Sequence, residues 1–321
     1  MRNVIRSLPV CIALAACCAV HAQDYPTRPV RVLVPYTPGG ITDLVTRITT
    51  VELAKSLGQT FVVDNRPGAN SILAVDMVSK ATPDGYTLGT VIAAHAANQT
   101  LYAKLPYDSV KSFEHVSLLV TSPLIVVVTN SLAANSIKEL IDLAKAKPGQ
   151  LSFGSSGIGA AAHLTTELFM ATTGIKMVHV PYKGTAPALQ DLIGGQINFM
   201  MDTPMPAMLP QVRAGKVKAI GMASDKRVAI ATDIPTLIEQ GVQVVGGTWV
   251  ALLAPAGTPK PVVDKLSRAA GEAMRRPEIK ERLAQFGIEP VGSTSVEFTA
   301  FLKNEVTKWA KVIKDANVKI D

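Results

Sequence analysis

The sequence is poor in cysteine, and its three cysteines, Cys11, Cys17 and Cys18, all lie near the amino terminus of the 321-residue chain. The rest of the chain can therefore form no disulfide bond, and a zinc or redox site built on cysteine is excluded there. Aromatic residues make up only 5% of the chain, and its basic residues are scattered. Surfaces that bind nucleic acid combine clustered basic residues with aromatic ones, so no nucleic-acid partner is expected.

The chain also lacks any apolar run long enough to cross a membrane, which takes about 20 residues. Its longest run, Leu8 to Val20, follows Arg2 and Arg6 and is followed by small residues. This pattern is typical of a secretory signal peptide. It predicts that residues 1–22 are removed by cleavage before Gln23 and that the mature protein is exported.

A second kind of processing stays open. The stretch Leu14 to Cys17 resembles a lipoprotein processing site, which would leave the mature protein anchored to a membrane by a lipid on Cys17. The small-residue cleavage site just beyond it favours the soluble form.

The mature chain is modestly basic. Without Arg2 and Arg6 it has 30 basic residues against 25 acidic ones, a net charge of +5, which serves solubility and would also attract small anions. Because no disulfide is available, stability must come from a buried core. A length of about 300 residues allows such a core and favours two lobes.

The stretch Val32 to Asp43 predicts a buried strand, a sharp glycine turn and the start of a helix. Gly39 and Gly40 have no side chains to block approach to their backbone. Their N–H groups and the unpaired donors of the first helical turn can converge on a negative group. The turn is therefore a candidate anion site, although the same pattern also occurs as a plain connection in α/β sheets.

Strand and helix signals alternate after this turn, with a strand at 61–63, a helix at about 71–80 and a strand at 86–91. This order predicts a parallel sheet joined by right-handed crossovers. Ligands of such sheets gather at the carboxyl ends of the strands. Tyr36 to Gly40 and a predicted loop at 93–98 both fall there.

A second glycine turn repeats the pattern downstream. Ser155 to Gly159 form a serine- and glycine-rich loop between a short strand and a helix at 160–173. Pro181 to Thr185 again precede a helix, and the strand at 197–201 ends at Asp202. Each half of the chain thus contains a strand, a glycine turn and a helix, which predicts two similar lobes that face each other.

The connection between the halves and the carboxyl-terminal tail have their own signals. Pro123 interrupts an apolar run, so the chain is expected to cross between lobes there. Ser136 with Glu139 and Thr294 with Glu297 are capping-box patterns that predict helix starts. After the strand at 248–253 only helices are expected.

Some of these residues also suggest a hydrolase, but this hypothesis is the weaker one. Ser155 or Ser156, His163 and Asp202 could form a catalytic triad, but no G-x-S-x-G motif frames either serine. In the plainer interpretation, His163 is a partner for nearby polar groups on the helix face, and Asp202 is a turn or capping residue. The protein is therefore not expected to be an enzyme.

No cofactor or metal is expected either. Gly157 to Ala162 fit the loose dinucleotide pattern G-x-G-x-x-A, but the next strand ends in Pro181 and Tyr182 rather than in the acid that would hold a ribose. The histidines beyond the leader show no metal-ligand spacing. They are His95, His115, His163 and His179.

Short motifs run through the whole mature chain. They are Tyr25 to Pro29, Pro35 to Gly40 with Asp43 and Arg47, Asn65 to Ala69, Pro83 to Tyr86, Ser155 to Gly157 with Gly159, His163 and Leu164, Pro181 to Gly184, Asp202, Asp233 to Thr236 with Glu239 and Gly241, Ala254 to Pro259, and Lys308 with Trp309. Together, their order and spacing resemble those of Bug-type solute receptors, the extracytoplasmic binding components of tripartite tricarboxylate transporters.

The resemblance implies an α/β fold of the periplasmic-binding-protein (Venus flytrap, type II-like) kind. Each lobe is then a largely parallel sheet flanked by helices. Residues 23–121 and 248–321 would form the first lobe, and residues 122–247 the second. The hinge is expected near 121–123 and 245–248.

The resemblance also implies a site in which the two glycine turns grip a carboxylate, largely with main-chain N–H groups and water. The first jaw would comprise Tyr36, Thr37, Pro38, Gly39, Gly40 and Asp43. The second would comprise Ser155, Ser156, Gly159, His163, Tyr182, Gly184, Thr185 and Asp202. His95, in the predicted loop at 93–98, is a candidate specificity residue or an exposed one.

The implied ligand is a small carboxylate, and a dicarboxylate, a tricarboxylate, an acidic amino acid and an aromatic carboxylate all stay open. The implied partners are membrane permease subunits, and the protein itself is expected to be a periplasmic monomer. A sensor that passes its closed state to a membrane signalling protein would need the same surface, so that role is the alternative.

Overall fold

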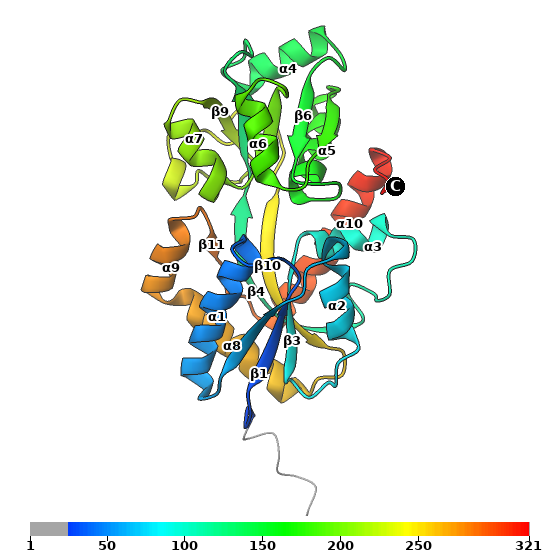
Figure 1. Ribbon diagram of the computed structural model, residues 1–321, viewed down its shortest axis with the longest axis vertical. Coiled ribbons are helices and arrows are strands. Elements are labelled where there is room, and N and C mark those ends of the chain that lie inside the picture. The colour runs from blue at the N-terminus through cyan, green and yellow to red at the C-terminus, as the bar shows by residue number, and fades with distance from the viewer. Residues whose placement is uncertain (1–24, 321) are drawn as a thin grey trace, which may run out of the picture.

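The computed structural model describes residues 25–320. The predicted signal peptide and the alternative lipid site at Cys17 lie outside these residues. Within them, no helix combines the length and the apolar character needed to cross a bilayer. The described chain forms two α/β lobes, each built on one sheet (Figure 1).

The first sheet has six strands in the order β11, β4, β10, β3, β1, β2. Their bounds are β1 Val30–Val34, β2 Phe61–Asn65, β3 Thr87–Ile92, β4 Phe113–Pro123, β10 Gly247–Pro255 and β11 Glu289–Pro290. Helices α1 Ile41–Leu57, α8 Lys260–Arg275 and α9 Pro277–Ala284 cover one face, and α2 Ile72–Ser79, α3 Ala94–Leu101 and α10 Ser295–Asp315 cover the other. Successive strand residues point to opposite faces, so Val32 enters one core and Leu33 the other.

The second sheet has five strands in the order β7, β6, β8, β5, β9. Their bounds are β5 Ile125–Thr129, β6 Ser152–Ser155, β7 Val178–Pro181, β8 Phe199–Asp202 and β9 Val217–Met222. Helices α4 Ile137–Ala146 and α5 Ala161–Thr173 cover one face, and α6 Thr185–Ile193 and α7 Leu209–Arg213 cover the other. Both sheets are therefore buried on both faces, which explains why their strands are nearly continuous apolar runs.

Both sheets are mixed, whereas the sequence predicted largely parallel ones. β1 pairs in parallel with β2 and β3, and β6 pairs in parallel with β7 and β8. β10 pairs antiparallel with β3 and β4, and β5 pairs antiparallel with β8 and β9. The antiparallel strands are the ones nearest to the points where the chain passes between the lobes.

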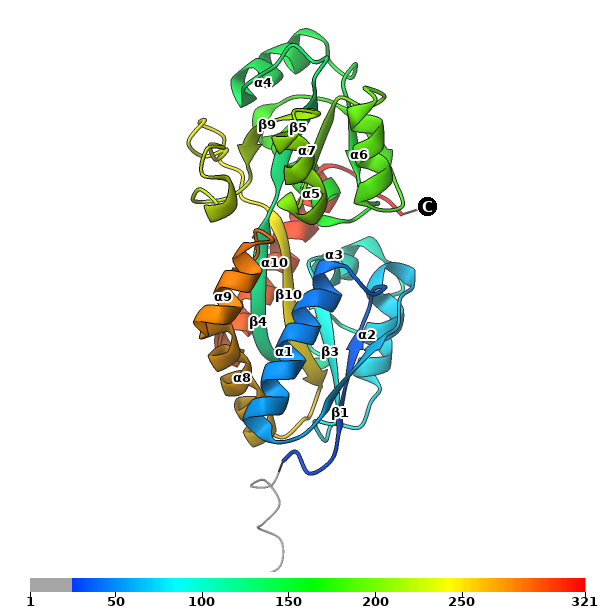
Figure 2. The same cartoon turned by 60° about the vertical axis from the view of Figure 1, so that its left-hand side comes forward.

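The chain passes between the lobes where β4 leads into β5, and again where it enters β10 (Figure 2). Gly247 lies opposite Pro123 at the end of the β4–β10 pairing. A Cβ atom added to Gly247 would lie 2.4 Å from the carbonyl oxygen of Ser122, so only glycine allows the two strands to approach this closely.

Two predictions of local structure are wrong. The predicted loop at 93–98 is mostly helix α3, because its alanines favour helix more than any other residue type. The carboxyl-terminal tail contains a strand as well as helices, since β11 pairs with β4 and Glu289 lies opposite Thr121. A strand of two residues is too short to produce a periodic signal.

Both predicted capping residues are confirmed. The Ser136 hydroxyl accepts a hydrogen bond from the Glu139 N–H at the start of α4. Thr294 and Glu297 form a reciprocal capping box at the start of α10.

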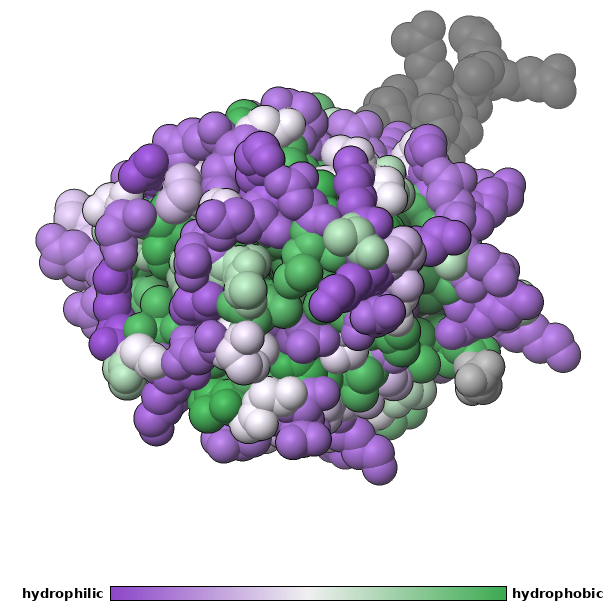
Figure 3. Space-filling view, turned by 90° about the horizontal axis from the view of Figure 1, so that it is seen from above, coloured by the Kyte–Doolittle hydropathy of each residue, from purple (hydrophilic) through white to green (hydrophobic). Residues whose placement is uncertain are grey.

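Seen from the α4 end, the second lobe is mostly hydrophilic with apolar residues interspersed (Figure 3).

A buried carboxylate ties the last helix to the crossing between the lobes. The indole Nε1 of Trp249, on β10, donates to Glu305 Oε2 over 3.0 Å, and that of Trp309 donates to the same oxygen over 2.9 Å. Lys308 Nζ lies 2.7 Å from Glu305 Oε1. Trp249 and Glu305 also line a pocket of about 240 Å³ beside Pro123. Glu305 thus satisfies the only two indole N–H groups of the chain.

Replacing this carboxylate should destabilise the protein. Glu305→Ala leaves two buried donors and one ammonium group without their acceptor, so we expect the free energy of unfolding to fall by about 3 kcal/mol. Glu305→Gln keeps one oxygen and should lose less. Urea unfolding followed by tryptophan fluorescence measures both. Lys311→Ala, which breaks an exposed pair with Asp315 on the same helix, is the control and should change stability by less than about 0.5 kcal/mol. If Glu305→Ala lost no more unfolding free energy than this control, the role of Glu305 as acceptor for both indole groups would be contradicted.

Candidate ligand-binding site

The first glycine turn leads from β1 into an uncapped helix. Gly40 is the N-cap residue of α1, with an extended backbone (φ −82°, ψ 174°) and no capping side chain. Thr37 to Gly40 are exposed, and a Cβ atom added to Gly40 would meet nothing within 4 Å. The N-terminal donors of α1 therefore open onto free space beside the turn.

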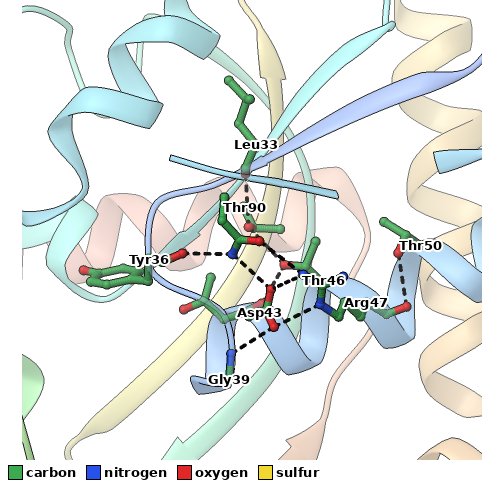
Figure 4. A network of polar contacts seen from close by, with 10 residues as sticks. Leu33, Tyr36, Gly39, Asp43, Thr46, Arg47, Thr50 and Thr90 are labelled. Atoms are coloured by element: carbon green, nitrogen blue, oxygen red, sulfur yellow. Dashed lines mark hydrogen bonds and ion pairs between the residues drawn. The ribbon is translucent and has the colours of Figure 1, made fainter. Parts of the chain in front are cut away.

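Asp43 holds this turn from inside the lobe (Figure 4). Its Oδ2 accepts from the Gly39 N–H and from Arg47 Nε, each over 3.0 Å, and its Oδ1 accepts from Asn65 Nδ2 over 3.0 Å. Burial alone would raise the pKa of Asp43, but the hydrogen bonds from Arg47, Asn65 and Gly39 outweigh it and hold the pKa below its ordinary value. Both oxygens and the Gly39 N–H are thus already used, and the geometry gives Asp43 a positioning role.

A strained segment adjoins the turn, and the sequence analysis missed it. Ala69, Asn70 and Ser71 are three successive non-glycine residues with positive φ, at 45°, 47° and 75°. Asn98, which is fully buried in α3, donates to the Asn70 carbonyl over 2.8 Å and accepts from Asn70 Nδ2 over 2.9 Å. Backbone of this kind costs about 1–3 kcal/mol per residue and gathers at functional sites, which adds Asn70 and Ser71 to the candidate site.

Tyr36 lies between the glycine turn and the strained segment. Asn65 Nδ2 donates to its carbonyl over 2.9 Å, and its hydroxyl hydrogen-bonds with the Ser71 side chain. Burial raises the pKa of Tyr36 to about 12, against the lowering effect of Ser71. The phenol therefore stays neutral and is a donor.

In the second lobe, Ser155 ends β6 and shapes the loop that follows. Its hydroxyl accepts from the Gly157 N–H over 3.3 Å and lies 3.1 Å from the Gly157 carbonyl oxygen. Gly157 and Gly159 have φ values of 145° and 76°, which only glycine adopts easily. Helix α5 then begins after Ala160, its N-cap residue, again without a capping side chain.

The proposed catalytic triad is not assembled. His163 Nδ1 accepts from the Gly159 N–H over 3.1 Å, and its Nε2 lies 3.5 Å from Glu167 Oε1. The serine that contacts an imidazole is Ser155, whose Oγ lies 2.7 Å from Nε2 of His179. His163 thus pairs with the Gly159 N–H of the preceding loop and lies near Glu167 on its own helix.

Asp202 accepts hydrogen bonds from the start of α6 and from the residue that follows β8. Its Oδ2 accepts from the Thr185 hydroxyl over 2.7 Å, and its Oδ1 accepts from the Thr203 N–H over 2.8 Å. Ser156 adds a further side-chain hydrogen bond. Burial raises the pKa of Asp202 above its ordinary value despite these donors. Thr185 opens α6, whose N-cap residue Gly184 has φ 120° and no capping side chain.

Two predicted site residues point elsewhere. The Tyr182 hydroxyl donates to Asp191 Oδ2 over 2.6 Å, so only its ring is available to a ligand. His95 is neither in a loop nor exposed, because it lies fully buried in α3. Its Nε2 hydrogen-bonds with the Ser109 carbonyl, and its ring stacks against Tyr107. His95 therefore belongs to the core of the first lobe.

The two glycine turns approach the same stretch of the first lobe. A Cβ atom added to Gly159 would lie 2.5 Å from Leu101 Cδ1 and 3.7 Å from Asn70 Nδ2. The Tyr36 hydroxyl bonds with Ser71, the next residue along. The turn of the second lobe thus faces the strained segment that flanks the turn of the first. Within residues 25–320, no group of three or more His, Asp and Glu side chains could hold a metal ion.

The fold is the two-lobed fold of periplasmic binding proteins. Residues 45–318 match the model of the tripartite tricarboxylate transporter family receptor, and the chain belongs to this family. It is 35% identical to protein BugT of Bordetella pertussis over 100% of this chain and 99% of that protein.

Two solved structures with bound carboxylates are similar to this chain. One is Rpa4515 of R. palustris with adipate, at 34% identity and a TM-score of 0.81 over 92% of this chain and 99% of that one. The other is MatC of Rhodopseudomonas palustris with bound malate, at 33% identity and a TM-score of 0.77 over 90% of this chain and all of that one. The family match agrees with the resemblance found in the sequence.

The role of Asp202 can be tested through pH. Because its pKa is raised in the folded state, the folded protein binds this proton more tightly than the unfolded chain does. That contribution to stability is fully present below the unfolded pKa and is lost as pH rises through the folded pKa. Asp202→Asn removes the ionisation, so its stability relative to the wild type should increase between pH 4 and pH 7.5.

Urea unfolding at the two pH values measures this difference. Asp202→Ala is the matched variant, because it removes the acceptor for Thr185 and Thr203 altogether and should lose about 1–3 kcal/mol at both pH values. A stability difference between wild type and Asp202→Asn that does not change with pH would contradict the buried, proton-binding carboxyl.

Proposed function

We propose that the protein captures a small carboxylate between its two lobes and delivers it to membrane permease subunits of the tripartite tricarboxylate transporter type. The signal-peptide pattern and the family support export to the periplasm. The carboxylates in the two similar structures support the ligand class.

One observation carries the proposal. Helix α1 begins at the first glycine turn, α5 at the second, and α6 after β7 of the second lobe. Their N-cap residues are Gly40, Ala160 and Gly184, and none of these has a capping side chain. The first N–H groups of a helix have no partner within the helix, and together they carry about half a positive charge. Several such ends around one space favour an anion there. Helices α4 and α10 begin with Ser136 and Thr294, which cap them, whereas α2, α3, α7, α8 and α9 also lack a capping side chain. The location of α1, α5 and α6, together with their free N-termini, is therefore what supports the proposal.

The carboxylate would close the protein by contacting both lobes. A ligand stabilises the form in which it makes more contacts, so the closed form gains population when a donor set from each lobe reaches the same anion. The residues that hold the two turns in place would be Asp43 in the first lobe and Asp202 in the second. Both use their oxygens inside their own lobe.

A thermal-shift screen of the mature protein tests the ligand class. Adipate, malate, aspartate and nicotinate represent the carboxylates that the sequence leaves open. A ligand that binds only the folded state raises its stability by about 2.7 kcal/mol at a hundredfold excess over Kd. We expect at least one carboxylate to raise Tm and the matching uncharged amide to have no effect. Equal shifts with acid and amide would contradict an anion site.

A change at one residue should separate stability from binding. Gly40→Asp puts a good N-cap side chain where the backbone is already extended and open, so the ligand-free protein should gain a few tenths of a kcal/mol. The new carboxylate would occupy the donors that the ligand needs, so carboxylate binding should fall more than tenfold, which is 1.4 kcal/mol. Isothermal titration calorimetry and urea unfolding measure the two effects.

Gly40→Ala is the control for this change, because it adds a Cβ atom without a charge or a cap. It should keep most of the binding. Undiminished binding in Gly40→Asp would contradict a ligand held at the start of α1.

A further inference from the structure

Two histidines of the second lobe form a stacked pair beneath the loop between β6 and α5. The rings of His163, on α5, and His179, on β7, have centroids 3.9 Å apart and planes inclined by 13°. Phe153 lies nearly parallel to His179, with centroids 4.7 Å apart. His163 is 4% exposed. The pair is therefore packed against the sheet rather than free in solvent.

Each imidazole holds one end of the loop. His179 Nε2 lies 2.7 Å from Ser155 Oγ at the start of the loop. His163 Nδ1 accepts the Gly159 N–H over 3.1 Å at its end. No other side chain of the described residues is recorded in a hydrogen bond with Gly159. The position of this loop thus depends on two imidazole groups, one at each end.

The bond to Gly159 exists only while His163 is neutral. Since the Gly159 N–H donates to Nδ1, that nitrogen carries no proton, and the ring proton lies on Nε2, which faces Glu167 Oε1 at 3.5 Å. A second proton must go to Nδ1, where it would point at the N–H of Gly159. Two donors repel, so protonation breaks this hydrogen bond.

The neighbours of the pair allow at most one charge. Burial and the adjacent His163 lower the pKa of His179 to about 4. Glu167 is the charged side chain of α5 that faces the pair, with Oε1 3.5 Å from Nε2 of His163. From β6 the facing side chains are Phe153 and Ser155, which carry no charge. A proton added to His163 would remove the acceptor that Gly159 uses.

We propose that the His163–His179 pair positions the second glycine turn for its anion and releases that turn in acid, so that carboxylate affinity falls as an imidazole takes up a proton. This inference rests on the proposed function, because it names the residues that hold one of the two jaws. His163 and His179 act through the loop and are positioning residues, without contact to the ligand.

A measurement on the ligand-free protein tests directly whether protonation of His163 releases Gly159. In a ¹H–¹⁵N NMR titration from pH 7.5 to 5, the Gly159 amide should shift along the same curve as the His163 ring and lose protection from hydrogen exchange. A Gly159 amide that keeps its shift while His163 titrates would overturn the proposal. This readout needs no ligand, so it also stands if the proposed function fails.

Variants connect the pair to binding. Asn places an oxygen where His has Nδ1, so His163→Asn keeps an acceptor for Gly159 that cannot titrate. With adipate or malate as the probe, whichever binds at pH 7.5, the wild type should lose about tenfold in affinity per bound proton for each pH unit below the apparent pKa. Whatever its affinity at pH 7.5, His163→Asn should lose less than about twofold of that affinity by pH 5.5.

Two further variants complete the test. His163→Leu removes the acceptor and should bind weakly at every pH. His115→Asn changes a histidine of the first lobe, whose Nδ1 lies 2.9 Å from Thr299 Oγ1, and should keep the pH profile of the wild type. Equal acid sensitivity in His163→Asn and the wild type would overturn the inference while leaving the proposed function intact. Failure of every carboxylate at pH 7.5 would instead overturn the proposed function.

Discussion

The structure depends on the antiparallel pairing of β4 and β10. These two strands lie side by side in the first sheet, and their pairing runs from Phe113 opposite Pro255 to Pro123 opposite Gly247. From that end the chain leaves for the second lobe and returns from it. Because a Cβ atom at Gly247 would collide with the backbone of Ser122, the crossing is narrow and close-packed. Movement of one lobe relative to the other must therefore take place within a few residues of this point.

Within each lobe, polar side chains shape the backbone around the space between the lobes. Asp43 gathers donors from Gly39, Arg47 and Asn65, and Asp202 does the same with Thr185 and Thr203. Asn98 holds three residues in left-handed backbone. Each of these groups is satisfied inside its own lobe before any ligand arrives. The N-cap residues of α1, α5 and α6 provide no such side-chain partner, which is consistent with the proposed site, in which main-chain donors meet the anion.

Much of this arrangement is visible in the sequence. Apolar periodicity, glycine turns and capping residues predict most strands and helices, and the motif order predicts the family. What the sequence hides depends on contacts between distant residues. The helix at 94–101 reads as a loop because it lacks a capping signal, and β11 exists only because β4 offers it an edge. The left-handed turn at 69–71 needs Asn98, which no local pattern connects to it. In the same way, no local pattern shows that Asp43 holds Gly39, Arg47 and Asn65, or that His95 is buried.

The uncapped start of α1 has a consequence for how such proteins diversify. A contact made by peptide groups survives almost any substitution, provided that Gly40 stays free of a bulky or acidic side chain. Neighbouring positions such as Ile41 and Thr37 can then vary without loss of the shared anchor. Gene copies could acquire new preferences through a few changes at these positions, while the main-chain geometry that we propose for carboxylate binding is inherited unchanged. Relatives that share only a third of their residues are compatible with such a history.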